Sequence, residues 1–159
     1  MRLSKNFTVR EFTNSVTAYR RGISNTPTEE HMSNIKKLVD KVIQPLRDKI
    51  GPIRISSGYR SPKLNRAIGG SSRSQHCKGM ASDLQFVRDN QMDNKVIFDN
   101  VIEMGLDFDQ MINEFDYKWI HISYNSKKNR KQILEAYKDG NNKTKYRDVT
   151  SNYINLKSL

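Results

Sequence analysis

The chain of 159 residues has the length of one ordinary domain and is long enough to bury a core without disulfide bonds. A hydrophobic fraction of 35% and a charged fraction of 28% are polar for a globular protein, but they exclude the apolar-poor composition of a disordered chain. The formal net charge of +11 indicates a polyanionic partner or environment, such as nucleic acid, an anionic membrane or a phosphate-rich cell wall.

Targeting and redox signals narrow the setting further. No apolar run approaches the length of a membrane span, so we expect no segment that crosses a bilayer. Residues 1–12 lack the apolar core of a signal peptide, and export by the ordinary secretory route is therefore not expected. The single cysteine, Cys77, permits no internal disulfide, so the fold cannot depend on one.

The first third of the chain predicts one long helix between extended segments. Residues 7–15 read as an extended piece. Residues 26–51 carry apolar side chains at three- and four-residue spacing, which is typical of a helix with one buried face, and Thr26 or Thr28 can cap it. Pro45 should kink or restart this helix and Gly51 should end it, after which 52–57 read as a short strand.

The rest of the chain adds strands and a second helix. Residues 57–74 predict a loop with about one helical turn, 82–87 a strand, and 90–106 a helical pattern that ends at Gly105. Residues 109–115 and 118–124 predict two strands joined by a tight turn near Asp116 and Tyr117. These elements describe an α+β domain on a mainly antiparallel sheet, expected over residues 1–140. Residues 141–159 are expected to form a polar, loosely held tail.

Alternation in the last predicted strand places a histidine in a cleft-like setting. Trp119, His121 and Ser123 lie on one face, whereas branched apolar residues lie on the other. If the turn is centred on residues 116 and 117, Glu114 pairs with Trp119 and becomes a diagonal neighbour of His121. Glu114 then reaches whatever group His121 binds.

The segment SQHCKGMASDLQF, residues 74–86, supplies two further candidate ligands, His76 and Asp83. Together with His121 they offer two nitrogens and one oxygen and leave a fourth tetrahedral position open, as in a catalytic zinc site. Cys77 adjoins His76, and because adjacent side chains seldom both point inward, it is not expected to be a ligand. A zinc ion would acidify a bound water, a carboxylate such as Glu114 would take the proton, and Arg60 is placed to bind the oxyanion or a substrate carboxylate.

These motifs resemble the M15 family of zinc-dependent peptidoglycan peptidases, especially the D-Ala-D-Ala carboxypeptidase-like branch that is common in phages. The family pattern Ser-x-His-x-x-Gly-x-Ala-x-Asp followed by Trp-x-His fits the chain at 74–83 and 119–121, and SGYRSPKLNRAIGG lies upstream at 57–70. The likeness extends over about residues 5–125. It implies a fold like that of hedgehog domains and D,D-peptidases, with helices on one face of the sheet and a zinc cleft on the other.

The resemblance also implies a role for each site residue. It makes His76, Asp83 and His121 the zinc ligands and Arg60 a substrate contact. Ser74 either orders the first ligand loop or binds substrate, and Trp119 is either a packing residue or a cleft wall. Many members carry the catalytic carboxylate three residues before the last histidine, where this chain has Lys118. The nearest acids are Asp116 and Glu114, and the hairpin face together with a DQ-x-x-x-E pattern favours Glu114.

The leading prediction is therefore a zinc metallopeptidase that hydrolyses peptidoglycan stem peptides, either next to a D-amino acid or between L-Ala and D-Glu. It would act as a monomer on cell wall, in the manner of an endolysin or a remodelling enzyme, from the cytoplasm of the producing or infected cell or from a virion. The competing hypothesis is a catalytically inactive zinc-binding protein of the same fold in a virion or on the wall. A nucleic-acid partner is not expected, because the lysines are scattered without interleaved aromatic residues.

Other polar residues are expected to be structural. His31 lies in the first helix away from any cluster and should be exposed, and the KKNRK run at 127–131 should form a solvated face. Asp109 and Gln110 are interpreted as the start of a strand.

Overall fold

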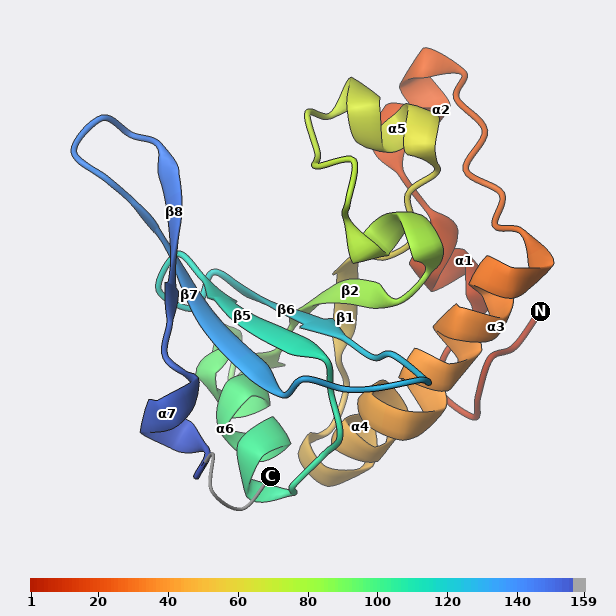
Figure 1. The fold of residues 1–159 in the computed structure, drawn as a ribbon. Helices are drawn as coiled ribbons and strands as arrows, with labels where there is room; N and C mark the ends of the chain where they lie inside the picture. The colour runs from red at the N-terminus through yellow and green to blue at the C-terminus, as the bar shows by residue number, and fades with distance from the viewer. Residues whose placement is uncertain (156–159) are drawn as a thin grey trace.

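The computed structural model describes residues 1–155, and a six-stranded sheet forms its centre (Figure 1). The strand order is β1-β2-β6-β5-β7-β8, and all neighbours are antiparallel except β5 and β7. The strands are β1 (Arg54–Ser57), β2 (Ala81–Gln85), β5 (Gln110–Glu114), β6 (Trp119–Ser123), β7 (Gln132–Lys138) and β8 (Thr144–Asp148). A separate hairpin pairs β3 (Val87–Arg88) with β4 (Gln91–Met92). The prediction of an α+β fold on a mainly antiparallel sheet is confirmed.

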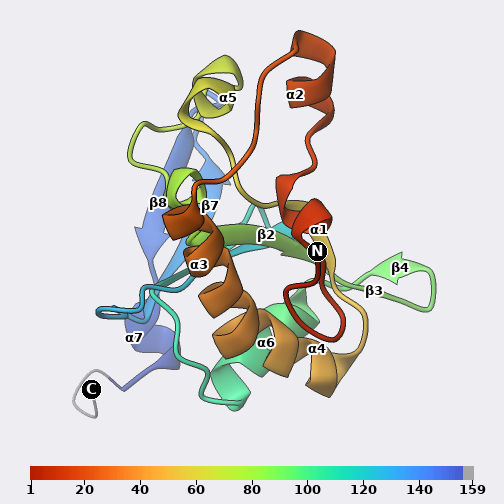
Figure 2. The ribbon, with the colours of Figure 1, turned by 90° about the vertical axis from the view of Figure 1, so that its right-hand side faces the viewer.

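Helices lie on both sides of this sheet. They are α1 (Val9–Thr13), α2 (Val16–Arg21), α3 (Glu29–Leu38), the π-helical segment η1 (Val39–Ile43), α4 (Gln44–Ile50), α5 (Pro62–Ala67), the 3-10 turn η2 (Gln75–Lys78), α6 (Lys95–Glu103) and α7 (Thr150–Tyr153). Figures 1 and 2 show α3, α4 and α6 below the sheet and α5 and η2 above it. The core lies between the sheet and the lower helices, where the fully buried residues include Leu38, Val42, Leu46, Leu84, Ile97, Met111 and Ile120.

The long N-terminal helix forms as predicted, and Pro45 changes its hydrogen bonding. Thr28 caps it by accepting a hydrogen bond from the backbone N–H of His31. Before Pro45 the helix passes through the π-helical turn, in which the N–H of Gln44 reaches back to the carbonyl of Val39. Pro45 then occupies the first turn of α4, where its missing N–H has no intrahelical partner to lose. The expected restart at Pro45 and the stop at Gly51 are both confirmed.

Three local predictions are corrected. Residues 7–15 are not extended, because the Glu11 carboxylate accepts a hydrogen bond from the Thr8 N–H and starts α1. The segment 57–74 contains the six-residue helix α5, longer than the expected turn. Met92, which fitted the helical pattern before Gly105, lies in β4.

The predicted hairpin is confirmed in position and register. Strands β5 and β6 pair Glu114 with Trp119 and Ile112 with His121. Residues 115–117 all have positive φ, and the Asn113 side chain stabilises this turn by accepting the N–H of Tyr117 at 2.6 Å. The register places Glu114 and His121 on the face of the sheet opposite the lower helices.

The C-terminal part of the sheet differs from prediction. Residues 144–148, expected in a loosely held tail, form β8 and pair with β7 along its length. The Thr150 hydroxyl, buried at the start of α7, accepts the N–H of Ile133 at 2.9 Å and ties the chain to the sheet. Residues 156–159 of the expected tail lie outside the described residues. None of the helices in the described part of the chain has the length and apolar composition needed to span a bilayer.

Candidate metal centre

Three buried side chains from separate elements meet above the sheet. Asp83 on β2 and His121 on β6 are direct partners across two paired strands, and η2 brings His76 over them. The His76 Nε2 atom lies 3.3 Å from His121 Nδ1 and 3.3 Å from Asp83 Oδ1, and His121 Nδ1 lies 3.1 Å from Asp83 Oδ1. The structure thus brings the three predicted ligands into one cluster.

The triangle of donor atoms has the size that a tetrahedral zinc ion requires. Zinc binds imidazole nitrogen and carboxylate oxygen at about 2.0–2.1 Å, so neighbouring ligand atoms of a tetrahedron are about 3.3–3.4 Å apart. The observed edges of 3.1 to 3.3 Å match that separation. The three residues also line a cavity of about 840 Å³, through which a substrate can reach them. The residues present therefore fit a divalent metal ion.

Backbone contacts fix the orientation of His76. Its Nδ1 lies 2.7 Å from the carbonyl oxygen of Gly58, and because a carbonyl only accepts, Nδ1 carries the proton and Nε2 presents its lone pair to the cluster. The Ser74 hydroxyl accepts the backbone N–H of His76 and caps η2, which is the ordering role anticipated for Ser74. Burial lowers the pKa of His76, and the imidazole is therefore neutral at neutral pH, as metal binding requires.

Gly79 explains why the motif needs a glycine after the ligand. It ends η2 with a φ of +69°, and a Cβ added there would lie 2.4 Å from the carbonyl oxygen of His31 on α3. Only glycine allows η2 to approach α3 this closely.

Asp83 is held ionised next to a guanidinium. Burial alone would raise the pKa of Asp83, but its polar contacts with the His121 and His76 rings outweigh burial and lower the pKa below the usual range of a carboxyl group. The second carboxylate oxygen, Oδ2, lies 3.5 Å from the Arg60 guanidinium. Ser57 and the buried Asn65 accept hydrogen bonds from Arg60 and fix its side chain at the edge of the cavity.

Glu114 and Trp119 line the same cavity. Glu114 is 8% exposed, and burial raises its pKa to about 7. Asp116 and Lys118 are exposed in the hairpin turn, and neither lines the cavity. The Trp119 ring packs edge-on against Phe115, with ring centroids 5.6 Å apart, so Trp119 both packs and faces the cavity.

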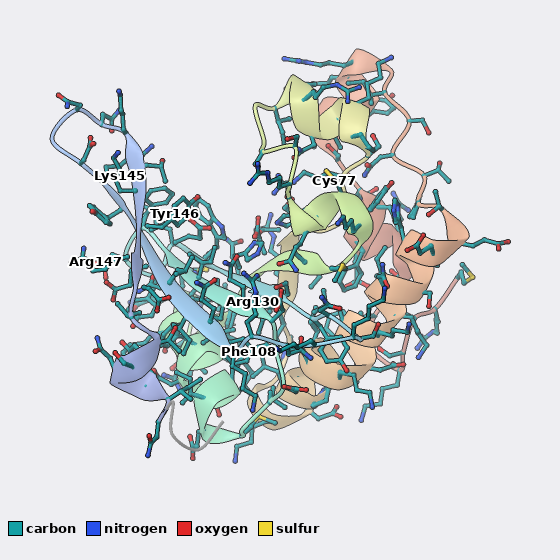
Figure 3. The ribbon with its side chains drawn as sticks, in the orientation of Figure 1. Cys77, Phe108, Arg130, Lys145, Tyr146 and Arg147 are labelled. Atoms are coloured by element: carbon teal, nitrogen blue, oxygen red, sulfur yellow. The ribbon has the colours of Figure 1, made fainter. Side chains whose placement is uncertain are left out.

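Asp109 supports the site in a way that sequence reasoning missed. This buried carboxylate accepts the backbone and side-chain N–H groups of Arg130 and the amide of Gln75 at 2.8 Å. Asp109 therefore ties η2, which carries His76, to the segment that leads into β7, where Arg130 is labelled in Figure 3. No local pattern signals the contact, because Asp109 and Arg130 lie 21 residues apart and Arg130 belongs to a run expected to be solvated.

The other histidine and the cysteine lie outside the cluster. Cys77, labelled in Figure 3, is buried outside the cluster, and burial raises the pKa of its thiol. Among the described residues, the metal-binding group contains no thiol. His31 is half-buried, and its Nδ1 lies 3.2 Å from the Tyr59 hydroxyl. The expectation that His31 is exposed is therefore wrong, because Tyr59 packs against its ring.

Two histidines and an aspartate on the floor of an open cavity form a donor set typical of metal-dependent hydrolases. Comparison with family models gives a match to the Peptidase M15 family over residues 5–123. The chain belongs to the Peptidase M15 family. A search of curated proteins found no match.

Proposed function

We propose that this chain is a zinc-dependent peptidase that hydrolyses peptidoglycan stem peptides. The observation that carries the proposal is the triangle of His76, Asp83 and His121 donor atoms, sized for a tetrahedral zinc ion and open to a cavity. Family membership supports peptide-bond hydrolysis, and the motif resemblance favours cell-wall peptides with D-amino acids.

The side chains around the triangle have complementary roles in this proposal. The zinc ion, when bound, supplies Lewis-acid chemistry at the scissile carbonyl. Glu114 acts as general base: its carboxylate takes a proton from the attacking water, the water oxygen bonds to the carbonyl carbon, and the C–N bond breaks as Glu114 returns the proton to the leaving amine. A pKa near 7 suits both directions of this transfer at neutral pH. Arg60 binds a substrate carboxylate, and Trp119 and Ser74 contact the peptide from the cavity wall.

The setting of this activity follows from the charge. A formal net charge of +11 favours approach to wall polymers that are rich in carboxylate and phosphate. The biological role in this proposal is lysis or remodelling of a bacterial wall, in a phage-related context, with D-Ala-D-Ala or L-Ala-D-Glu as the bond cleaved.

A second candidate is a zinc-binding wall or virion protein without catalysis. Lys118 favours it, because it stands where many family members carry the catalytic carboxylate. The two candidates differ in what Glu114 does.

Mass spectrometry of muropeptides tests the proposal. Zinc-loaded protein should release stem-peptide fragments from purified peptidoglycan, and a chelator or His121→Ala should stop the release. Glu114→Gln should lower kcat by about 10²–10⁴-fold while zinc content stays at one equivalent. Glu135→Gln is a matched control, because Glu135 lies on the opposite face of the neighbouring strand β7 and should leave kcat unchanged. Zinc binding without cleavage of any muropeptide, and no effect of Glu114→Gln, would favour the second candidate.

A further inference from the structure

Two strands beyond the family match form one wall of the metal cavity. The match ends at residue 123, whereas β7 and β8 span residues 132–148. Figure 1 shows their hairpin rising on one side of the sheet, opposite α5 and the segment that follows it. Leu134, Lys138, Thr144 and Tyr146 line the same cavity as the ligand triangle. This wall thus lies outside the residues that match the family.

Strand pairing determines which side chains of the hairpin face the cavity. Ala136 pairs with Glu114 on one side and with Tyr146 on the other, so all three share the cavity face. Lys138 lies two residues beyond Ala136 on the same face. Lys145 and Arg147 leave the opposite face of β8, where the Arg147 guanidinium lies 4.7 Å from the Tyr137 ring centroid (Figure 3). The hairpin therefore presents Lys138 and Tyr146 to the cavity, whereas Lys145 and Arg147 lie on its opposite face.

Lys138 is an exposed cation with no acidic partner among residues 1–155. Its Nζ donates to the Thr144 hydroxyl at 2.8 Å and lies 5.2 Å from the centroid of the Phe115 ring. Within residues 1–155, no carboxylate comes within ion-pair distance of this ammonium group. The hydroxyl and the ring hold the charge in place and leave it available to a ligand in the cavity.

Arg60, which pairs with Asp83, and Lys138 lie on opposite sides of the metal ligands. Across the sheet, Arg60 follows β1, Asp83 and His121 lie on β2 and β6, Glu114 on β5, and Lys138 on β7. Neighbouring strands are about 4.8 Å apart, so β2 and β7 are separated by about 14 Å. Strand register places Leu134 level with Asp83 and His121. Lys138 lies about 13 Å farther along β7, so about 20 Å separates Lys138 from Asp83 along the sheet. An extended peptide of about six residues covers that distance. A peptide that crosses the cavity therefore meets Arg60 near one end and Lys138 near the other.

We propose that Lys138 binds a second carboxylate of the substrate, so that the cavity selects peptides with a carboxylate on each side of the scissile bond. This inference rests on the proposed function, because it assigns the substrate class of the same site. It gives the β7–β8 hairpin the role of a specificity element.

The test measures binding without turnover. Zinc-loaded Glu114→Gln protein is titrated with a synthetic stem peptide that has a carboxylate on each side of the scissile bond, and with two versions in which one or the other carboxylate is a carboxamide. Lys138→Gln in this background should weaken binding of the diacid about tenfold. It should leave unchanged the binding of the peptide whose carboxamide replaces the carboxylate on the Lys138 side. Arg60→Gln should show the same pattern with the other carboxamide peptide. Lys138→Arg should restore most of the affinity, and Lys145→Gln, on the opposite face of β8, should change nothing.

The outcomes separate this inference from the proposed function. If Lys138→Gln lowers the affinity for the diacid and for both carboxamide peptides equally, Lys138 recognises no carboxylate and the inference is overturned. The inference is also overturned if the Lys138→Gln variant binds all three peptides as tightly as the Glu114→Gln parent does. The same holds if Lys145→Gln weakens binding as much as Lys138→Gln. Cleavage of the three peptides by protein with Glu114 intact is measured separately, so a wrong specificity element leaves the peptidase proposal standing. Absence of cleavage alongside the expected binding pattern would overturn only the hydrolytic role.

Discussion

Burial gives Glu114 a proton affinity that suits chemistry at neutral pH. Its neighbours have opposite effects on its pKa, because the charge of His121 lowers the value and that of Asp83 raises it, but burial has the larger effect and raises the pKa to about 7. A bound cation would lower this value, so the working pKa lies at or below 7. A general base acts only when deprotonated.

The pH dependence of kcat/KM follows from that sign. Activity should fall as the pH drops through the pKa of Glu114, which gives an acidic limb with a midpoint at or below about pH 7. Stem-peptide hydrolysis measured between pH 5 and 9 checks this, and the residual activity of Glu114→Gln should lack the limb. Hydrolysis that becomes faster from pH 7 down to pH 5 would exclude a carboxylate base.

Residue types and strand register were enough to anticipate part of the site. The two-residue period of strands and a turn at 116–117 placed Glu114 and His121 on one face, and the pairing of Glu114 with Trp119 confirms it. Contacts that join distant segments carry no such signal. The bonds of Asp109 to Arg130 and Gln75 depend on how η2 and the approach to β7 meet in space.

At the scale of elements, the short turn η2 determines where the first ligand lies. One side of η2 packs against α3 at Gly79, and the other side contacts Gly58, directly after β1, through the hydrogen bond of His76. A side chain at position 79 would push η2 away from α3 and displace His76 from Asp83 and His121.

Gly79→Ala therefore should lower both stability and zinc affinity. The positive φ alone costs alanine about 1–2 kcal/mol, and contact with the His31 carbonyl adds to it. Gly105→Ala is the matched control, because Gly105 has a φ of +62° but open space around it. Urea unfolding and zinc titration of both variants should show a larger loss of stability for Gly79→Ala and a loss of zinc affinity in that variant alone. Equal effects of the two substitutions would contradict the positioning role of η2.

Strand β8 shows which elements sequence patterns miss. All five of its residues are exposed, so it has no alternation of apolar and polar side chains to mark it as a strand. It forms because β7 offers a free edge and the turn at 139–143 brings the chain back along it, with Asp139 accepting backbone N–H groups of Asn141 and Lys143. The long helix, in contrast, was marked by its apolar period, its cap and its terminal glycine.

At the scale of the whole molecule, charge is distributed unevenly. Residues 124–159 carry nine of the 28 lysines and arginines but only three of the 17 acidic residues. More than half of the net charge therefore belongs to the part of the chain beyond the family match, which includes the proposed specificity element.

The metal centre is also a property of the whole fold, because its donors come from residues 76, 83 and 121. Their types and spacing, with the family resemblance, could be read from the sequence, whereas the 3.1 to 3.3 Å separations could not. The separations depend on the pairing of β2 with β6 and on the seat of η2 against α3.

Zinc titration of chelator-treated protein, with elemental analysis of the product, tests whether His76, Asp83 and His121 bind a metal ion. The unmodified protein should bind one equivalent of zinc, and His76→Ala, Asp83→Ala and His121→Ala should each abolish tight binding. His31→Ala, which removes the remaining histidine, should bind zinc like the unmodified protein. Failure of the folded, unmodified protein to bind zinc would contradict the assignment of His76, Asp83 and His121 as metal ligands. A loss of zinc affinity in His31→Ala as large as that in His121→Ala would contradict it as well.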